Sequence, residues 1–161
     1  MALSKITNQQ IDSSGLPSGS IIQTVQSTST TEFSPDSGGG SWQDAGYNIT
    51  ITPTSTSNKV LISFTSLGII RGPNTTGVML HRGSTEIWSG DGYSNNTAEW
   101  QMANYGFSYL DSPATTSATT YTVYMWGDTI TSIEQMRMTY QSGTTTGNAA
   151  QAVLIAQEIV G

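Results

Sequence analysis

Apolar and polar residues alternate along short segments of this chain, and clusters of Gly, Pro, Asn and Ser separate the segments. Such alternation places successive side chains on opposite faces of a β-strand. No stretch of ten or more residues shows a 3.6-residue apolar period with caps, so we expect no helix of that length. The pattern predicts nine strands, over residues 21–26, 47–52, 59–70, 77–82, 85–88, 100–110, 119–126, 133–140 and 151–159.

The segment 47–52 has the alternation of a strand with one wet face. Tyr47, Ile49 and Ile51 share one face, and Asn48 and Thr50 share the other. A strand of an antiparallel sheet with one solvated face has this pattern. We expect it on the outside of a sandwich.

In the segment 59–70 the apolar residues change parity. They stand at even positions up to Phe64 and at odd positions from Leu67 onward. Because a one-residue slip turns every later side chain to the opposite face, a β-bulge near residues 66–68 would reconcile the two halves. A strand buried on both faces is the alternative.

The closing segment is apolar on both faces, which is typical of a strand in a core or at a subunit interface. We expect it to form a subunit interface through Ala152, Val153, Leu154, Ile155 and Ala156. Glu158, the only charge in this segment, should then lie at its end or find a partner.

These segments predict an all-β chain with one domain. Eight or nine antiparallel strands in about 140 residues fit a jelly-roll sandwich, and other β-sandwich or barrel topologies stay open. The pair Gly83-Ser84 fits a two-residue type II′ hairpin turn. Residues 20–161 form the predicted domain and residues 1–19 a short N-terminal arm, with a disordered tail as the alternative. Leu3, Ile6 and Ile11 are the sizeable apolar groups of the arm and its predicted anchors on a particle.

Composition excludes several partners. Charged residues make up 10% of the chain and the net charge is −6, so the 47 Ser and Thr residues carry much of the polar surface. The five Lys and Arg residues are scattered, which argues against nucleic acid as a partner. No apolar run approaches about 18 residues and no signal peptide is recognisable, so we expect no membrane partner.

Residues that could perform catalysis are scarce. The chain has no Cys, and His81 is its one histidine, in a predicted strand. Glu86, Asp91 and Glu99 could supply a glycosidase pair or calcium ligands, but they follow no fixed ligand spacing. We therefore expect no enzyme, no metal and no cofactor.

The segment 88–100 is the stronger candidate for recognition. Aromatic rings beside amides and carboxylates can stack on sugar rings and bond their hydroxyl groups. The candidate glycan contacts are Trp88, Asp91, Tyr93, Asn95 and Trp100. The alternative is that Trp88 and Trp100 belong to the core.

Several segments carry a resemblance to a known family. They are GLPSGSIIQTVQ, ITPTSTSNKVLISFT, RGSTEIW, YLDSPATTSATTYTVYMW and the closing AVLIAQEIVG. Over residues 15–161 the chain resembles small proteins and fibre-tip domains of tailed bacteriophages, with LDSPATTSATTYTV as the strongest signature. The resemblance implies a jelly roll of the tumour-necrosis-factor or complement-globular type that assembles as a homotrimer on the virion.

Two functions follow from these observations. The short arm before the predicted domain has no heptads or collagen-like repeat, which favours a trimeric capsid decoration (cement) protein docked on the major capsid protein or another virion protein. The alternative is a tail-fibre or receptor-binding module that recognises cell-surface carbohydrate. Either protein would be made in the host cytoplasm and would act at the virion surface.

Overall fold

The computed structural model describes residues 15–31, 33, 41–71, 74–95, 100–127, 136–138 and 151–161. These residues form nine strands, and the remaining ones lie before, between or after the strands. The strands are β1 (Ile21–Ser29), β2 (Gln43–Ile51), β3 (Lys59–Arg71), β4 (Asn74–Arg82), β5 (Thr85–Asn95), β6 (Trp100–Asp111), β7 (Thr119–Gly127), β8 (Met136–Met138) and β9 (Ala152–Ile159). The all-β prediction is confirmed.

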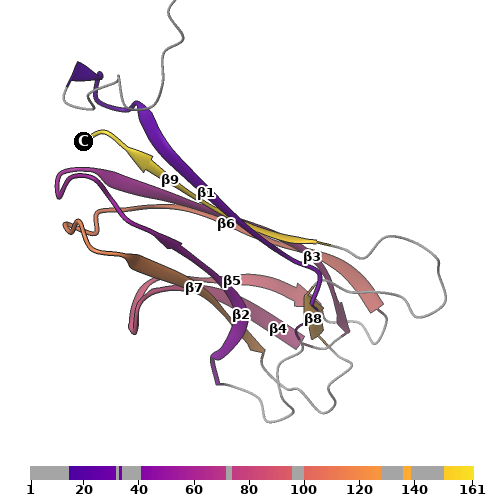
Figure 1. Cartoon of the computed structure of the whole chain (residues 1–161). Helices are drawn as coiled ribbons and strands as arrows, with labels where there is room; N and C mark the ends of the chain where they lie inside the picture. The colour runs from indigo at the N-terminus through magenta and orange to yellow at the C-terminus, as the bar shows by residue number, and fades with distance from the viewer. Residues whose placement is uncertain are drawn as a thin grey trace, which may run out of the picture.

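Two antiparallel sheets pack face to face (Figure 1). The five-stranded sheet has the order β1-β9-β3-β6, and the short β8 also pairs with β3, beyond the end of β9. The four-stranded sheet has the order β2-β7-β4-β5. β2 is an edge strand of this sheet, and its single buried face agrees with the prediction of a strand on the outside of a sandwich.

The strand order is that of a jelly roll. Four antiparallel pairs, β1 with β9, β2 with β7, β3 with β6 and β4 with β5, alternate between the two sheets. This is the path of one long hairpin whose two arms roll up together into a double-sheet sandwich. Among the topologies that spacing alone left open, the structure selects this one.

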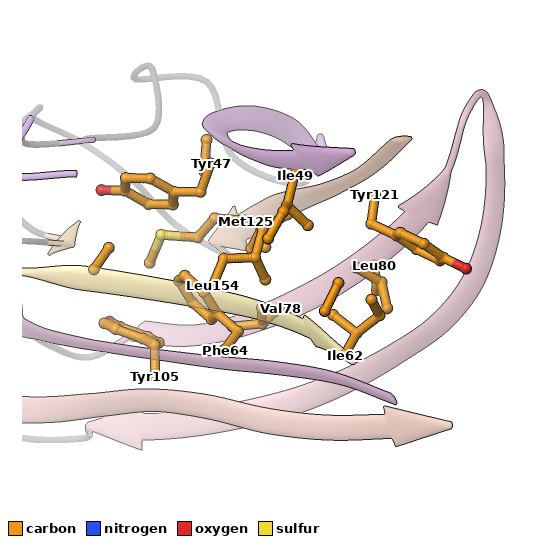
Figure 2. Close-up of a cluster of buried hydrophobic side chains, with 14 of the residues drawn as sticks. Tyr47, Ile49, Ile62, Phe64, Val78, Leu80, Tyr105, Tyr121, Met125 and Leu154 are labelled. Atoms are coloured by element: carbon orange, nitrogen blue, oxygen red, sulfur yellow. The ribbon is translucent and has the colours of Figure 1, made fainter. Parts of the chain in front are cut away.

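Inward-facing side chains of both sheets form one core (Figure 2). Tyr47 and Phe64 meet across the two sheets with ring centroids 5.7 Å apart, and Phe64 lies 5.7 Å from Phe107 on the neighbouring strand. Figure 2 shows Leu80 and Tyr121 from the four-stranded sheet close to Ile62 of β3. Interdigitated aliphatic and aromatic side chains from two sheets are what hold such sandwiches together.

The predicted bulge in β3 is wrong. The register between β3 and β6 runs without a shift from Val60 to Arg71. Ser66, which is 1% exposed, and Gly68 take the inward positions after Phe64, while Leu67 points outward and is 44% exposed. The pairing is therefore regular, and up to Gly68 the strand is not buried on both faces: the parity change reflects the small inward residues Ser66 and Gly68 on either side of the outward Leu67.

The hairpin between β4 and β5 matches one prediction and corrects another. Gly83, with φ +59°, occupies the first position of a two-residue turn, as the predicted type II′ turn requires. β5, however, continues to Asn95, which pairs with Asn74, so most of the segment after Trp88, which the sequence left between two predicted strands, is itself a strand.

Both ends of the described domain meet at one corner of the five-stranded sheet. The Gly19 amide donates to the Val160 carbonyl at 2.8 Å, and the Val160 amide donates to the Ser20 carbonyl at 2.9 Å. The segment before β1 is thereby held beside the end of β9, close to the C-terminus marked in Figure 1.

Candidate interaction surfaces

The residues predicted to contact glycan do not form one described site. Trp88 points into the sandwich, where its ring lies 4.7 Å from Phe107 and packs against the core. The core interpretation is therefore correct for Trp88. Asp91, Tyr93 and Asn95 belong to β5 and Trp100 opens β6, but the side chains of these four residues lie outside the part that the structure describes.

The predicted subunit interface splits between two environments. Ala152, Leu154 and Ala156 are at most 2% exposed and belong to the core of a single chain, so they are not interface residues. Val153 and Ile155 alternate with them and lie, half-buried, on the outward face of the five-stranded sheet. The predicted anchors Leu3, Ile6 and Ile11 fall outside the described residues.

The outward face of the five-stranded sheet, here called the assembly face, joins side chains from its four long strands. Val153 and Ile155 of β9 pair with Thr65 and Ser63 of β3. Leu61 of β3 pairs with Leu110 of β6. Serine and threonine hydroxyls separate the aliphatic groups, and the Ser63 and Ser108 hydroxyls lie 3.2 Å apart. The face is thus a lattice of aliphatic and hydroxyl side chains.

Large apolar groups on the assembly face are unusually open to solvent. Leu67 is 44%, Leu110 47% and Met102 57% exposed. Among the described outward side chains of this sheet, Lys59 at the start of β3 is the one charge. Among its described side chains this face thus has exposed apolar groups and one charge, a composition typical of protein-contact surfaces.

Glu158 lies buried at the end of β9 and has the partners that its burial requires. Its carboxylate is 0% exposed. Oε1 accepts hydrogen bonds from the Thr54 amide at 2.6 Å, the Thr54 hydroxyl at 2.8 Å and the Asn58 side-chain amide at 2.7 Å. With its amide oriented to satisfy both groups, Gln23 of β1 donates to Oε2 and to the Thr52 carbonyl. The expectation that Glu158 lies at the strand end or finds a partner is confirmed on both counts.

A second buried carboxylate explains part of the LDSPATTSATTYTV signature. Asp111 is 5% exposed and accepts a hydrogen bond from the Tyr121 hydroxyl at 2.7 Å. It also forms an ion pair with Arg82 at 2.9 Å. Burial and the Asp111 carboxylate raise the pKa of Tyr121 well above its ordinary range. The motif thus joins β6, β7 and β4 across the two sheets, which is a structural role.

Sequence reasoning missed a group of aromatic residues on the outward face of the four-stranded sheet. Trp42 and Trp126 form a tilted pair with ring centroids 6.1 Å apart. Tyr124, two residues before Trp126 on β7, stacks on His81 of β4 at 4.1 Å. The alternate positions of Tyr124 and Trp126 in the predicted strand 119–126 could have indicated an outward aromatic row, but the pairing with Trp42 depends on contacts between distant segments.

The described residues contain no group of three His, Asp or Glu side chains that could hold a metal ion. A small cavity between β1, β2 and β9 has a volume of about 20 Å³ and is lined by Ser27, Ser29, Tyr47, Phe64 and Leu154, among others. That volume accommodates about one water molecule. Within the described ranges there is no helix long and apolar enough to cross a membrane.

No protein-family model matches the sequence, and no curated protein matches it. Among solved structures, the chain is similar to one of infectious bursal disease virus, Gx strain, with a TM-score of 0.46 and 12% identity over 86% of this chain and 36% of that one. A mutant VP2 protein of the same virus, in derived particles, gives a TM-score of 0.41 and 13% identity over 86% and 37%. The structure of the Gt strain gives a TM-score of 0.36 and 14% identity over 89% of this chain and 37% of that one. The chain thus spans little more than a third of the chains it matches, and the jelly-roll assignment rests on the strand order above.

Proposed function

We propose that this chain is a non-enzymatic structural protein of a virus particle, a homotrimeric decoration protein that docks on the capsid shell. The observation that carries the proposal is the assembly face, where the described side chains include exposed aliphatic groups and a single charge, on a sheet that also holds the start of the domain. An arm before residue 20 would leave the domain from this same sheet. The resemblance to phage surface proteins supports the same assignment.

The assembly face supports self-association on physical grounds. Leu67, Leu110 and Met102 each keep roughly half of their surface in water in a single chain. Burying a large apolar side chain fully contributes about 1.5–3 kcal/mol, so these groups together could supply several kcal/mol to subunit contact. Burial of their neighbours Val153 and Ile155 would add to it.

The oligomeric state tests this surface. Light scattering and equilibrium sedimentation at micromolar concentration should give the mass of a trimer for the wild type. Leu67→Asp and Leu110→Asp should give folded monomers, because each places a charge in the contact. Thr50→Asp, on the outward face of the other sheet, is the matched control and should leave the trimer intact. A wild-type monomer at these concentrations would contradict the proposal.

The location on the particle is tested separately. A chain lacking residues 1–15 should form the same trimer but lose its attachment to shells, because the arm is proposed to hold it there. Full occupancy by the truncated chain would assign no anchoring role to the arm. Copies spread over the shell support decoration, whereas a few copies at a tail would favour the receptor-binding alternative.

A further inference from the structure

The outward face of the four-stranded sheet carries aromatic rings that neither the core nor the assembly face uses. Trp42, just before β2, and Trp126 of β7 lie side by side at the edge of the sheet, with their planes 38° apart. Because the rings are tilted and 6.1 Å apart, they are not stacked face to face. Both are half-buried, as is Tyr124 beside them. We call these three residues the aromatic strip.

The strip is held in place from the centre of the sheet. The His81 ring stacks on Tyr124 with an interplanar angle of 28°, and His81 Nε2 donates to the Met79 sulfur at 2.9 Å, since a thioether can only accept. Met79 is 4% exposed although it belongs to the outward face. These contacts fix the orientation of Tyr124 before any ligand arrives.

A β-bulge places a carboxylate next to the rings. The register between β2 and β7 shifts between Asp44 and Tyr47, and Gly46, with φ +75°, provides the left-handed backbone there. The Gly46 amide donates to Asp44 Oδ1 at 2.7 Å, so the carboxylate is oriented. Asp44 is exposed and stands opposite Tyr124 in the register. Bulges that redirect one side chain are common beside binding sites.

Charge limits what can bind. Among the described outward side chains of this sheet the charged ones are Asp44 and Glu86, both acidic, and none is Lys or Arg. A phosphorylated, sulfated or sialylated ligand would be repelled by these carboxylates and would find no cation to pair with among the described side chains of this face. The remaining polar groups are amide and hydroxyl, including Asn48 and Thr122.

We propose that the aromatic strip with Asp44 binds a neutral oligosaccharide. The C–H faces of pyranose rings pack on the two indoles, and Asp44 accepts hydrogen bonds from sugar hydroxyl groups. β2 is the edge strand of the described sheet, and we expect a chain of sugars to extend along it. This site differs from the segment 88–100 that the sequence suggested, and it does not depend on the trimer.

The test uses the full-length protein in native gels that contain dissolved neutral polysaccharides, namely dextran, starch, galactomannan and hydroxyethyl cellulose, with alginate as the anionic probe. At least one neutral polymer should retard the wild type. Tryptophan fluorescence titrated with the matching hexasaccharide then gives Kd. Trp126→Ala and Trp42→Ala should each raise Kd about tenfold or more, and Asp44→Asn by a smaller factor, without a change in trimer mass. Thr50→Ala, at the far end of the same face, should leave Kd unchanged.

Three outcomes would overturn the proposal. These are no retardation by any neutral polymer, stronger retardation by alginate, and equal Kd values for the wild type and the tryptophan variants. If Trp126→Ala fails to fold by circular dichroism, Trp42→Ala and Asp44→Asn still decide, because Trp42 directly precedes the edge strand β2 and Asp44 is an exposed residue of that strand. If the protein binds a neutral polysaccharide but forms no trimer, the proposed function fails and this proposal stands. If it forms the trimer but binds no neutral polysaccharide, this proposal fails and the proposed function stands.

Discussion

Replacing Glu158 tests whether a buried carboxylate with neutral partners stabilises this fold. Glu158→Ala removes the acceptor of four hydrogen bonds, two from Thr54, one from Asn58 and one from Gln23. Hydrogen bonds to a charged group contribute about 1.5–3 kcal/mol each, but Thr54 is exposed and its groups can turn to water. Asn58 is 4% exposed and would lose its partner in a dry site. The removal of a buried charge offsets part of this loss.

The balance predicts that Glu158→Ala lowers the free energy of unfolding by about 2–4 kcal/mol. Glu158→Gln keeps one oxygen for the same donors and should cost about half as much, because charge assistance and the contact between Oε2 and Gln23 are lost. Urea unfolding at neutral pH, followed by tryptophan fluorescence, measures both. Glu86→Gln, an exposed glutamate bonded to Ser89, is the control and should stay within about 0.5 kcal/mol of the wild type. A Glu158→Ala variant as stable as this control would refute the reasoning.

Three further substitutions test other parts of the fold by the same unfolding assay. Trp88→Ala should cost about 3–5 kcal/mol, because the indole packs on Phe107 in the core, and a loss under 1 kcal/mol would contradict that packing. Gly83→Val should cost at least about 1 kcal/mol, since a β-branched residue is strained at φ +59°. The pKa of Tyr121 is raised in the folded state, chiefly by burial and then by its bond to Asp111. Its contribution to stability is therefore present below about pH 10 and is lost as the pH rises further, and Tyr121→Phe should flatten that alkaline decline; equal slopes in both proteins would count against it.

Local alternation predicted the strands well where one face is buried. Tyr47, Ile49 and Ile51 of β2 are all buried, and Asn48 and Thr50 between them are exposed, as expected. The rule failed in β3, where Ser66 and Gly68 take inward positions. Small residues carry no apolar signal, so a pattern search loses the strand face and infers a bulge.

The end of β5 was missed for a different reason. The segment after Trp88 is rich in Gly, Ser, Asp and Asn, which are turn-forming residues. Pairing with β4 from Gly77 to Asn74 nevertheless continues the strand to Asn95. Tertiary pairing overrides local preference here, and that pairing cannot be read from spacing alone.

The surfaces depend even more on distant contacts. Trp42 and Trp126 are 84 positions apart in the sequence, and Glu158 meets Asn58 across 100 positions. Sequence reasoning identified a need for a partner at Glu158 because a buried charge requires one, but it could not name the partner. For the tryptophans there is no such requirement, so nothing in the sequence marked them as a pair.

The two buried carboxylates act at the same end of the sandwich. Val60 of β3 pairs with Glu158 on one side and with Asp111 on the other, so both acids lie in one inward row of the five-stranded sheet. From that row Asp111 reaches Arg82 and Tyr121 of the opposite sheet, while Glu158 holds the turn that leads from β2 into β3. A chain without cysteine thus closes one end of its core with hydrogen bonds that join the sheets.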